Sequence, residues 1–394
     1  MVLGTGYVGL PLAILLARTG LSVVGVDIRK EVVRAINDRT LPIREKEIDS
    51  VFREPEVRKN LVASESVEDG DAFVISVPTP LERRRKIADL SAVVAALESI
   101  LPRLKKGNLV ILESTVPPLT CREIVTPLIQ EKTGLRVNEE VGLVHCPERI
   151  LPGNIFEEII KNDRVIGSLS VTARQRARAI YSRFVKGRIF LTDDLTAELV
   201  KLMENSYRDV NIALANEFSE VAETLGVDIS EAIEIANAHP RVKILRPGIG
   251  VGGHCIPIDP WFITEVDPTH TTLIQTARRI NDSMPERTAM KIRRSIADLK
   301  DPIVVLIGMA YKPETDDARE SPALEVAKLL QSDGYQIRHY DPLVPGCGYA
   351  SLKALVEGAD FLGILVPHRI VVDEVTRDES IIKASMRTAR IMVF

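Results

Sequence analysis

The sequence has few cysteines, no excess of basic residues and no long hydrophobic run, and each deficit excludes a class of protein. Its four cysteines show no framework spacing, which is typical of free thiols in a reducing compartment. A net charge of -4 disfavours a nucleic-acid partner, because such proteins usually present a basic surface. No apolar run approaches the roughly 20 residues of a membrane span, and the start lacks a signal-peptide pattern. We therefore expect a cytoplasmic protein without membrane or nucleic-acid partners.

The clearest local signal lies at the start of the chain. Gly4, Gly6 and Gly9 form a GxGxxG pattern between an apolar start and an apolar helical stretch, and Asp27 ends the next predicted strand. In a dinucleotide-binding turn such glycines permit close approach to a pyrophosphate, and the acid binds a ribose hydroxyl. We therefore predict an NAD site, although a turn without a ligand is the alternative and Arg29 could favour NADP. The few residues before Gly4 suggest a chain that begins upstream.

The middle and end of the chain differ from the start. Alternating strand and helix patterns predict a doubly wound parallel sheet at first. From about Asp194 to Gly226 the absence of proline and internal glycine predicts one long helix, and a second strand-helix-strand unit starts near Pro302. The predicted fold is α/β, with two Rossmann-like doubly wound domains joined by a central helical domain. The predicted domain boundaries are 1–190, 191–295 and 296–394.

Two stretches add detail to this architecture. "VEDGDAFVISVP" from Val67 matches "VEGADFLGILVP" from Val356 at six of 12 positions, which predicts equivalent places in the two sheets. The second sheet lacks the full glycine fingerprint, so we expect it to bind a different nucleotide. The basic cluster Arg83 to Lys86 is predicted to be a solvated loop.

A single thiol follows a glycine-rich stretch, "RPGIGVGGHCIPIDPW". Four glycines precede Cys255, and Asp259 follows four residues later. Glycines let backbone and ligand come close, so the thiol is expected to be accessible. Together with a hydride acceptor, this predicts aldehyde oxidation through a thiohemiacetal and a thioester, with Asp259 orienting water or accepting a proton. The thiolate would need a nearby cation or a cluster of backbone N–H groups.

Three other interpretations of these features are open. A buried cysteine is usually an inert, small hydrophobic residue. A zinc site built from His145, Cys146, His254 and Cys255 lacks the usual ligand spacing, so we expect no metal. A non-catalytic nucleotide-binding protein would keep the glycine loops and have no need for the thiol.

Seven motifs in order give the chain a resemblance to a known family. They are "GTGYVGLP", "SVPTP", "ESTVPP", "CPER", "ELVKLMENSY", "GVGGHCIPID" and "YKPETDDARESP". The chain resembles, over essentially its whole length, the nucleotide-sugar 6-dehydrogenases, the family of UDP-glucose and GDP-mannose dehydrogenase. The resemblance implies an NAD-binding first domain, a helical dimerising middle and a UDP-binding last domain. It also implies oxidation of the C6 alcohol of a UDP-sugar to a carboxylate with two NAD, by a homodimer or larger homo-oligomer.

The same resemblance implies roles for individual residues. Cys255 matches the nucleophile and Asp259 the nearby acid. Lys201 and Asn205 share a helix face, and their spacing alone favours an ordinary solvated pair. The family match instead assigns them to the oxyanion and the reacting oxygen, a task that suits an ammonium and an amide donor.

Further roles come from the remaining motifs. Thr115 matches the threonine that binds the catalytic water, and Glu148 the glutamate of proton transfer and thioester hydrolysis. The cofactor-binding residues implied are Gly4, Gly6, Tyr7, Val8, Gly9, Asp27, Thr79, Thr115 and Arg319. The substrate-binding residues implied are Glu148, Arg149, Lys201, Asn205, His239, Arg241, Gly252 and Lys312.

The choice of sugar depends on finer features. "PERILPGN" stands where members acting on glucose usually have an "EFL" type stretch. The stretches "NDRVIG" and "HPRVKILRPG" and the residue His254 also distinguish the chain from those members. These features are similar to the branch that oxidises UDP-N-acetyl-D-mannosamine. Arg241 matches an arginine that reaches the substrate, often from the neighbouring subunit. UDP-N-acetylglucosamine and UDP-glucose are the alternative substrates within the family.

Overall fold

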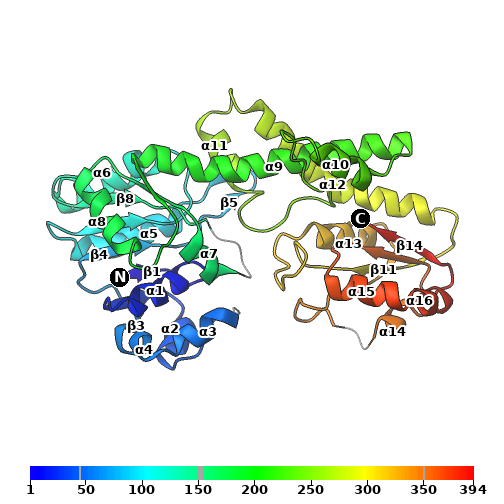
Figure 1. The fold of residues 1–394 in the computed structure, drawn as a ribbon, viewed down its shortest axis with the longest axis horizontal. Helices are drawn as coiled ribbons and strands as arrows, with labels where there is room; N and C mark the ends of the chain where they lie inside the picture. The colour runs from blue at the N-terminus through cyan, green and yellow to red at the C-terminus, as the bar shows by residue number, and fades with distance from the viewer. Residues whose placement is uncertain (44–45, 150–153, 349–350) are drawn as a thin grey trace. The chain divides into compact units, whose positions relative to one another are not determined.

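The computed structural model describes residues 1–43, 46–149, 154–348 and 351–394 (Figure 1). Residues 150–153 of the "PERILPGN" stretch therefore lie outside the described residues. The chain forms two compact units. The first consists of Met1–Glu204 with Trp261–Pro268, and the second of Asn205–Pro260 with Thr269–Phe394. The bounds of these two units do not test the predicted division into three domains, which stays a prediction.

The first unit is built on an eight-stranded sheet in the order β10-β9-β8-β7-β4-β1-β2-β3. Its strands are β1 Val2–Leu3, β2 Val23–Val26, β3 Leu61–Ser64, β4 Ala72–Ile75, β7 Leu109–Leu112, β8 Gly142–His145, β9 Arg164–Gly167 and β10 Ile189–Thr192. All neighbours run parallel except β8 and β9. The doubly wound sheet is thus confirmed, with one antiparallel pairing that the sequence pattern did not predict.

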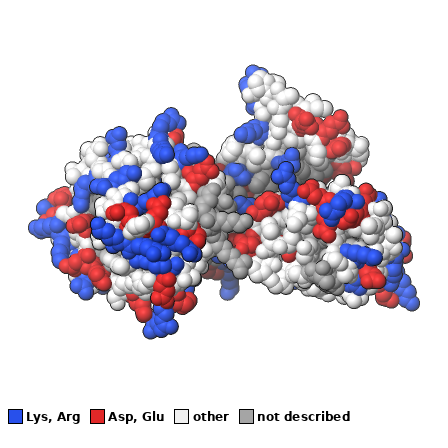
Figure 2. Space-filling view, turned by 60° about the horizontal axis from the view of Figure 1, so that its bottom comes forward, with Lys and Arg blue, Asp and Glu red and all other residues white. Residues whose placement is uncertain are grey.

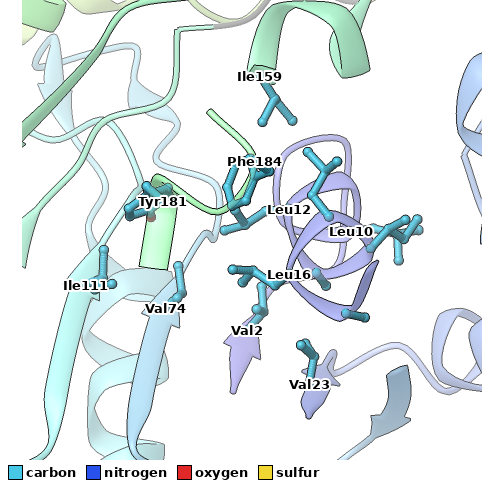
Figure 3. Close-up of a cluster of buried hydrophobic side chains, with 14 of the residues drawn as sticks. Val2, Leu10, Leu12, Leu16, Val23, Val74, Ile111, Ile159, Tyr181 and Phe184 are labelled. Carbon is cyan, nitrogen blue, oxygen red and sulfur yellow. The ribbon is translucent and has the colours of Figure 1, made fainter. Parts of the chain in front are cut away.

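Apolar layers cover both faces of this sheet. Neighbouring strand residues point to opposite faces, so Val2 joins one buried cluster and Leu3 the other. Leu10, Leu12 and Leu16 of α1 pack on the first face (Figure 3). The helical segments of this unit are α1 Gly9–Arg18, α2 Lys30–Asn37, α3 Lys46–Phe52, α4 Pro55–Asn60, α5 Ser91–Ile100, η1 Leu101–Arg103, η2 Cys121–Val125, α6 Thr126–Thr133, α7 Ile155–Lys161 and α8 Val171–Tyr181. Burial on both faces explains why the strands are continuous apolar runs.

The predicted long helix is confirmed as α9, Asp194–Leu225, a helix of 32 residues (Figure 1). It ends just before Gly226, whose φ of 70° is a left-handed conformation that favours glycine at a helix end. The other central helices are α10 Ile229–Asn237, α11 Asp259–Val266 and α12 Thr272–Ile296. None of the helices in the described residues is long and apolar enough to cross a membrane.

The second unit carries a four-stranded parallel sheet in the order β12-β11-β13-β14. Its strands are β11 Ile303–Ile307, β12 Gln336–Tyr340, β13 Phe361–Ile364 and β14 Arg390–Val393, and its helices are α13 Pro322–Ser332, α14 Leu352–Val356, α15 Arg369–Arg377 and α16 Glu379–Ser385. The two matching sequence segments place β4 and β13 at the same positions, and each strand pairs with the first strand of its own sheet. The predicted equivalence is confirmed.

The basic cluster Arg83 to Lys86 is an exposed turn, as predicted for a solvated loop. The turn joins the strands of a small hairpin, β5 Leu81–Glu82 and β6 Ile87–Ala88, which the sequence analysis did not predict. The Lys86 ammonium lies 3.8 Å from the centroid of the Trp261 ring. This cation-π contact with a tryptophan far along the chain has no local sequence signal.

Surface charges show no segregation by sign on the face drawn in Figure 2. Lys and Arg side chains alternate there with Asp and Glu. Many charged side chains of the described residues form ion pairs, such as Arg188 with Asp163 and Arg18 with Glu54.

Candidate functional site

The glycine turn leaves space for a ligand at the start of α1. Gly4 has a φ of 86°, and a Cβ atom there would lie 2.4 Å from the Ser76 carbonyl oxygen. A Cβ at Gly9 would lie 1.9 Å from the Gly4 carbonyl oxygen, whereas a Cβ at Gly6 would meet nothing within 4 Å. The outer glycines are thus required by packing. The middle one keeps open the helix N-terminus, where phosphate charge is favoured.

Tyr7 and Val8, also predicted to bind the cofactor, complete this turn. Val8 is the residue before α1, and Tyr7 is an exposed aromatic side chain. The structure therefore places all five turn residues of the prediction in one loop. Their role in binding remains a prediction.

Asp27 follows β2 and is held on both carboxylate oxygens. Its Oδ2 accepts from the Thr5 backbone N–H and hydroxyl, both at 3.0 Å, and its Oδ1 accepts from the Arg29 backbone N–H at 3.0 Å. Burial opposes ionisation, but the hydrogen bonds, led by the Arg29 N–H, hold the pKa of Asp27 below its usual range. The carboxylate is therefore ionised at neutral pH. Ile28, which the sequence analysis missed, is 94% exposed beside it and offers an apolar surface to a flat ring.

Two predicted threonines meet at the carboxyl edge of the same sheet. The Thr79 hydroxyl donates to the Thr115 carbonyl oxygen at 2.7 Å. Next to them, the Ser114 hydroxyl donates to the Val77 carbonyl and accepts from the Val77 N–H. The loops after β4 and β7 are thus fastened together. In open α/β sheets this edge is where ligands bind.

Glu148 lies in a buried cluster of charges. Its Oε1 accepts from the Arg149 backbone N–H at 2.7 Å, and its Oε2 accepts from Arg164 Nη2 at 2.9 Å. The other arm of Arg164 donates to Glu113 at 3.0 Å, and the Tyr181 hydroxyl donates to the same Glu113 oxygen at 3.1 Å. The sequence analysis missed Arg164, Glu113 and Tyr181. A charge within a buried apolar strand, as in "NDRVIG", was the available signal.

Arg149, predicted to bind substrate, has its guanidinium on other protein groups. It forms a two-pronged ion pair with Glu204 of α9, and Nη1 donates to the Asp163 carbonyl oxygen at 2.8 Å. The loop that carries Glu148 is thereby tied to α9. A direct role of Arg149 at the substrate stays a prediction.

The residues predicted around the thiol also come together. Asn205 of α9 donates through Nδ2 to Asp259 Oδ2 at 2.6 Å, and the Asp259 N–H donates to the Cys255 carbonyl oxygen at 2.9 Å. Asp259 is the first residue of α11, where the helix dipole favours a negative charge. Lys201 is buried one helical turn before Asn205. The structure thus links Asn205, Asp259 and the Cys255 loop.

The two glycines nearest the exposed Cys255, Gly252 and Gly253, pack against protein. A Cβ at Gly252 would lie 2.5 Å from the Glu320 carbonyl oxygen, and one at Gly253 would lie 3.0 Å from the Tyr311 ring. The accessibility of the thiol was predicted correctly. The structure gives a further reason for the glycines, which is the close seating of the loop on residues 311–322 of the same unit.

Residues 311–322 contain the predicted Lys312 and Arg319. Arg319 forms a fork with Asp317 through Nε at 2.9 Å and Nη2 at 2.8 Å, and Lys312 Nζ lies 5.7 Å from the Tyr311 ring centroid. Burial raises the pKa of Tyr311 to about 12, and the neighbouring Asp317 and Cys255 add to the rise. Tyr311 and Asp317 are therefore site neighbours that the sequence analysis missed, although they stand in a quoted motif.

His254 lies on the surface but is partly shielded from water, and His239 and Arg241 also lie on the surface. Burial lowers the pKa of His254, Arg319 lowers it further, and Asp317 opposes both. His239 and Arg241 are exposed after α10, and the Arg241 N–H donates to His239 Nδ1 at 3.4 Å. A contact of Arg241 with substrate or with a neighbouring subunit stays a prediction.

In the described part of the chain, no group of three or more His, Cys, Asp or Glu residues could hold a metal ion. His145 and Cys146 are buried at the end of β8. Burial lowers the pKa of His145 to about 3 and raises the pKa of the Cys146 thiol to about 12.

Three domains of one family match the chain in order. The UDP-glucose/GDP-mannose dehydrogenase family matches with its NAD binding domain over residues 1–185, its central domain over 195–283 and its UDP binding domain over 305–392.

Individual relatives resemble almost the whole chain. UDP-N-acetyl-D-mannosamine dehydrogenase of Methanocaldococcus jannaschii is 46% identical over 372 residues, which is 93% of this chain and 85% of the relative. The structure of UDP-D-ManNAc dehydrogenase from Pyrococcus horikoshii has a TM-score of 0.94 and 44% identity, covering 100% of this chain and 95% of that one. The UDP-N-acetyl-mannosamine dehydrogenase of Staphylococcus aureus has a TM-score of 0.90 and 40% identity, covering 99% of this chain and 93% of that one.

Proposed function

Because the chain belongs to the UDP-glucose/GDP-mannose dehydrogenase family, we propose that it oxidises UDP-N-acetyl-D-mannosamine to UDP-N-acetyl-D-mannosaminuronate. The chain is an NAD-dependent nucleotide-sugar dehydrogenase. The observation that carries the choice of sugar is that relatives bearing this enzyme name match nearly its whole length. UDP-N-acetylglucosamine and UDP-glucose are the alternative substrates.

The described residues support a covalent mechanism. NAD, held by the glycine turn and Asp27, would supply the hydride acceptor for each of the two oxidations. After the first, the Cys255 thiolate adds to C6 of the sugar aldehyde and forms a thiohemiacetal; removal of the second hydride leaves a thioester. Lys201 and the Asn205 amide stabilise the negative oxygen in these steps. Asp259, bonded to Asn205, fixes that amide and is placed beside the loop of the thiol.

Release of the product requires water. Thr115 holds the water, and Glu148 accepts its proton as the C–S bond of the thioester breaks. The thiol of Cys255 is regenerated and the sugar leaves as a carboxylate. Each sugar therefore reduces two NAD.

The test is the yield of NADH per sugar in three proteins: the natural chain, Cys255→Ala and Cys255→Ser. We expect two NADH and one carboxylate per sugar from the natural chain, and no net acid from Cys255→Ala, with NAD binding retained. Serine is a poorer nucleophile at neutral pH, so Cys255→Ser should be severely slowed. Uronic acid formation by Cys255→Ala at the natural rate would show that Cys255 only packs.

The substrate is tested with a panel of UDP-sugars and GDP-mannose. UDP-N-acetyl-D-mannosamine should be oxidised with far higher kcat/KM than UDP-glucose, because a site built for an acetamido group leaves polar groups unpaired without it. A preference for UDP-glucose would contradict the proposed sugar. If none of the tested sugars yields NADH, the result would support the alternative of a non-catalytic nucleotide-binding protein.

We also infer a homodimer formed through α9. Large apolar side chains are exposed along the helix at Leu199, Met203, Tyr207, Leu214, Phe218, Val221 and Leu225. At about 100° per residue they fall within an arc of about 100°, roughly opposite Lys201 and Asn205. A continuous stripe of this length suits a second copy of the same helix. The cytoplasmic location predicted from the sequence stays a prediction.

A further inference from the structure

The buried cluster around Glu148 contains one more acid than base. Arg164 brings one positive charge, and Glu113 and Glu148 bring two carboxyl groups. All three side chains are buried. Ionisation of both acids would leave a net negative charge out of contact with water, which is costly. A proton on one of the two acids would leave these three side chains neutral as a group.

Arg164 is the cation in the described contacts of Glu113. Arg164 Nη1 also approaches Cys146 Sγ at 3.7 Å, and its guanidinium carbon lies 4.7 Å from the Tyr181 ring centroid. The charged and titratable groups described around Glu113 are Glu148 from the loop after β8, Arg164 from β9, Tyr181 from α8 and Cys146 directly after β8. Of these four groups, Arg164 alone carries a positive charge.

Hydrogen bonding identifies the carboxyl group that holds the proton. Both oxygens of Glu148 accept hydrogen bonds, one from a backbone N–H and one from Arg164. In Glu113 only Oε1 accepts hydrogen bonds, and Oε2 is buried with no partner among the described residues. A buried oxygen without a hydrogen-bond partner costs more free energy in an ionised carboxylate than in a neutral carboxylic acid, because the carboxylate places negative charge on that oxygen. Burial and the neighbouring Glu148 raise the pKa of Glu113 to about 8, with Arg164 opposing them.

We propose that Arg164 and Glu113 are positioning residues for Glu148: Arg164 holds both carboxyl groups in one fork, and Glu113 carries the proton that keeps the cluster neutral. Glu148 is then held aligned, by Arg164 and by the Arg149 N–H, to accept a proton from water. This inference rests on the proposed role of Glu148 in thioester hydrolysis.

Infrared difference spectroscopy of the full-length protein, recorded against pH, reports the proton directly. In the natural chain we expect the C=O band of a protonated carboxyl group, and this band should disappear as the pH rises through about 8. The same band should be missing in Glu113→Gln. Glu198 is a second buried acid, whose pKa burial raises to about 7, so its band should remain in Glu113→Gln and serves as the internal control. A spectrum unchanged by Glu113→Gln would overturn the proposal.

The rate test uses the ratio of NADH formation by Glu113→Gln to that by the natural chain, because titrations shared by both proteins cancel. Glutamine is the neutral isostere, so the ratio should be constant at about pH 6 to 7 and change once the pH exceeds the pKa of Glu113, about 8. A ratio that is the same at every pH would contradict the proposal.

Arg164→Lys tests the fork. A lysine ammonium cannot bond two carboxyl groups in one plane as a guanidinium can, so we expect the rate to fall about tenfold or more. In the double variant with Glu113→Gln, the lysine has to bind one carboxylate instead of two. The double variant should therefore be faster than Arg164→Lys alone. Absence of this rescue, with both variants folded by circular dichroism, would overturn the shared-cation part of the proposal. The infrared band does not depend on turnover. An infrared result that contradicts the role of Glu113 can therefore be told apart from a Cys255 result that contradicts the proposed function.

Discussion

Asp27 combines two tasks in one side chain. Its Oδ2 fixes the glycine turn through Thr5, and its Oδ1 holds the backbone and guanidinium of Arg29. At the predicted ribose site, the carboxylate would therefore keep Arg29 paired and repel a 2'-phosphate. An arginine beside Asp27 is thus compatible with the predicted NAD site.

Asp27→Asn should shift the cofactor preference toward NADP. The amide keeps the shape and one acceptor but removes the negative charge, which frees Arg29 to bind a phosphate. We expect the ratio of kcat/KM for NADP to that for NAD to rise by about tenfold, since one charge-assisted contact corresponds to about 1.5–3 kcal/mol. The same measurement in Asp27→Asn with Arg29→Ala is the control and should show little gain. An unchanged ratio in Asp27→Asn would contradict this account.

The sequence was most informative where function depends on local spacing. Gly4, Gly9 and Asp27 could be predicted because the turn, the helix start and the strand end are all encoded within one short segment. Arg164 could not, since its partners Glu113 and Glu148 lie on other strands or loops and meet it only through sheet order. The apolar strand around Arg164 signals a buried charge, but the acids that this charge pairs with are not visible until the strands are assembled.

At the scale of elements, the loop of Cys255 is shaped by what it packs on. Gly252 faces the Glu320 carbonyl oxygen and Pro322, which are backbone and ring atoms that yield little. The same stretch contains Gly248, which would meet nothing within 4 Å. The two glycines therefore differ in a way that the sequence alone does not reveal.

Gly252→Ala should displace the loop and slow the enzyme. The added methyl group would lie 2.5 Å from backbone oxygen, and relief of such overpacking typically costs about 1–3 kcal/mol. We expect a lower thermal midpoint together with a reduced kcat. Gly248→Ala is the matched control and should leave both close to those of the natural chain. Equal effects of the two substitutions would show that the packing against Glu320 is not what requires glycine.

The ion pair between Arg149 and Glu204 connects the loop of Glu148 to α9. Both side chains are partly exposed, so screening limits the contribution of the pair to stability to about 1 kcal/mol or less. Its larger effect should be on geometry. Arg149→Glu and Glu204→Arg are each expected to lower kcat about tenfold, and the double exchange should recover part of the loss. Additive losses in the double variant, measured as NADH formation, would mean that the pair does not align the site.

Element type was predicted well, and element pairing less so. The α9 helix followed from a run without proline or internal glycine, and β13 from its likeness to β4. The antiparallel pairing of β8 with β9 rests on a single residue pair, His145 with Gly167, and had no sequence signal. The hairpin at residues 81–88 likewise contacts a residue far along the chain, because Lys86 lies over the Trp261 ring.

For the whole molecule, the apolar stripe of α9 predicts the oligomeric state. Replacing Phe218 and Val221 by Asp places two charges in the middle of the proposed interface, where desolvation of an unpaired charge is costly. We expect sedimentation equilibrium to show a monomer for this variant and a dimer or larger species for the natural chain. Asp substitutions at Glu217 and Glu220 keep the negative charge and serve as the control. A dimer that survives both apolar replacements would place the interface elsewhere.

The interleaving of the two units has a consequence for protein synthesis. The segment Trp261–Pro268 belongs to the first unit, although Asn205–Pro260 of the second unit precedes it in the chain. Trp261 lies under Lys86, Phe262 is fully buried, and Glu265 accepts a hydrogen bond from the Ala88 N–H at 2.8 Å. On the ribosome, the first unit therefore has to wait for residues made well after its last strand. A recombinant fragment ending at Glu204 would expose the surface that these side chains cover, and the cofactor-binding half is expected to express as a stable fragment only when this later segment is supplied with it.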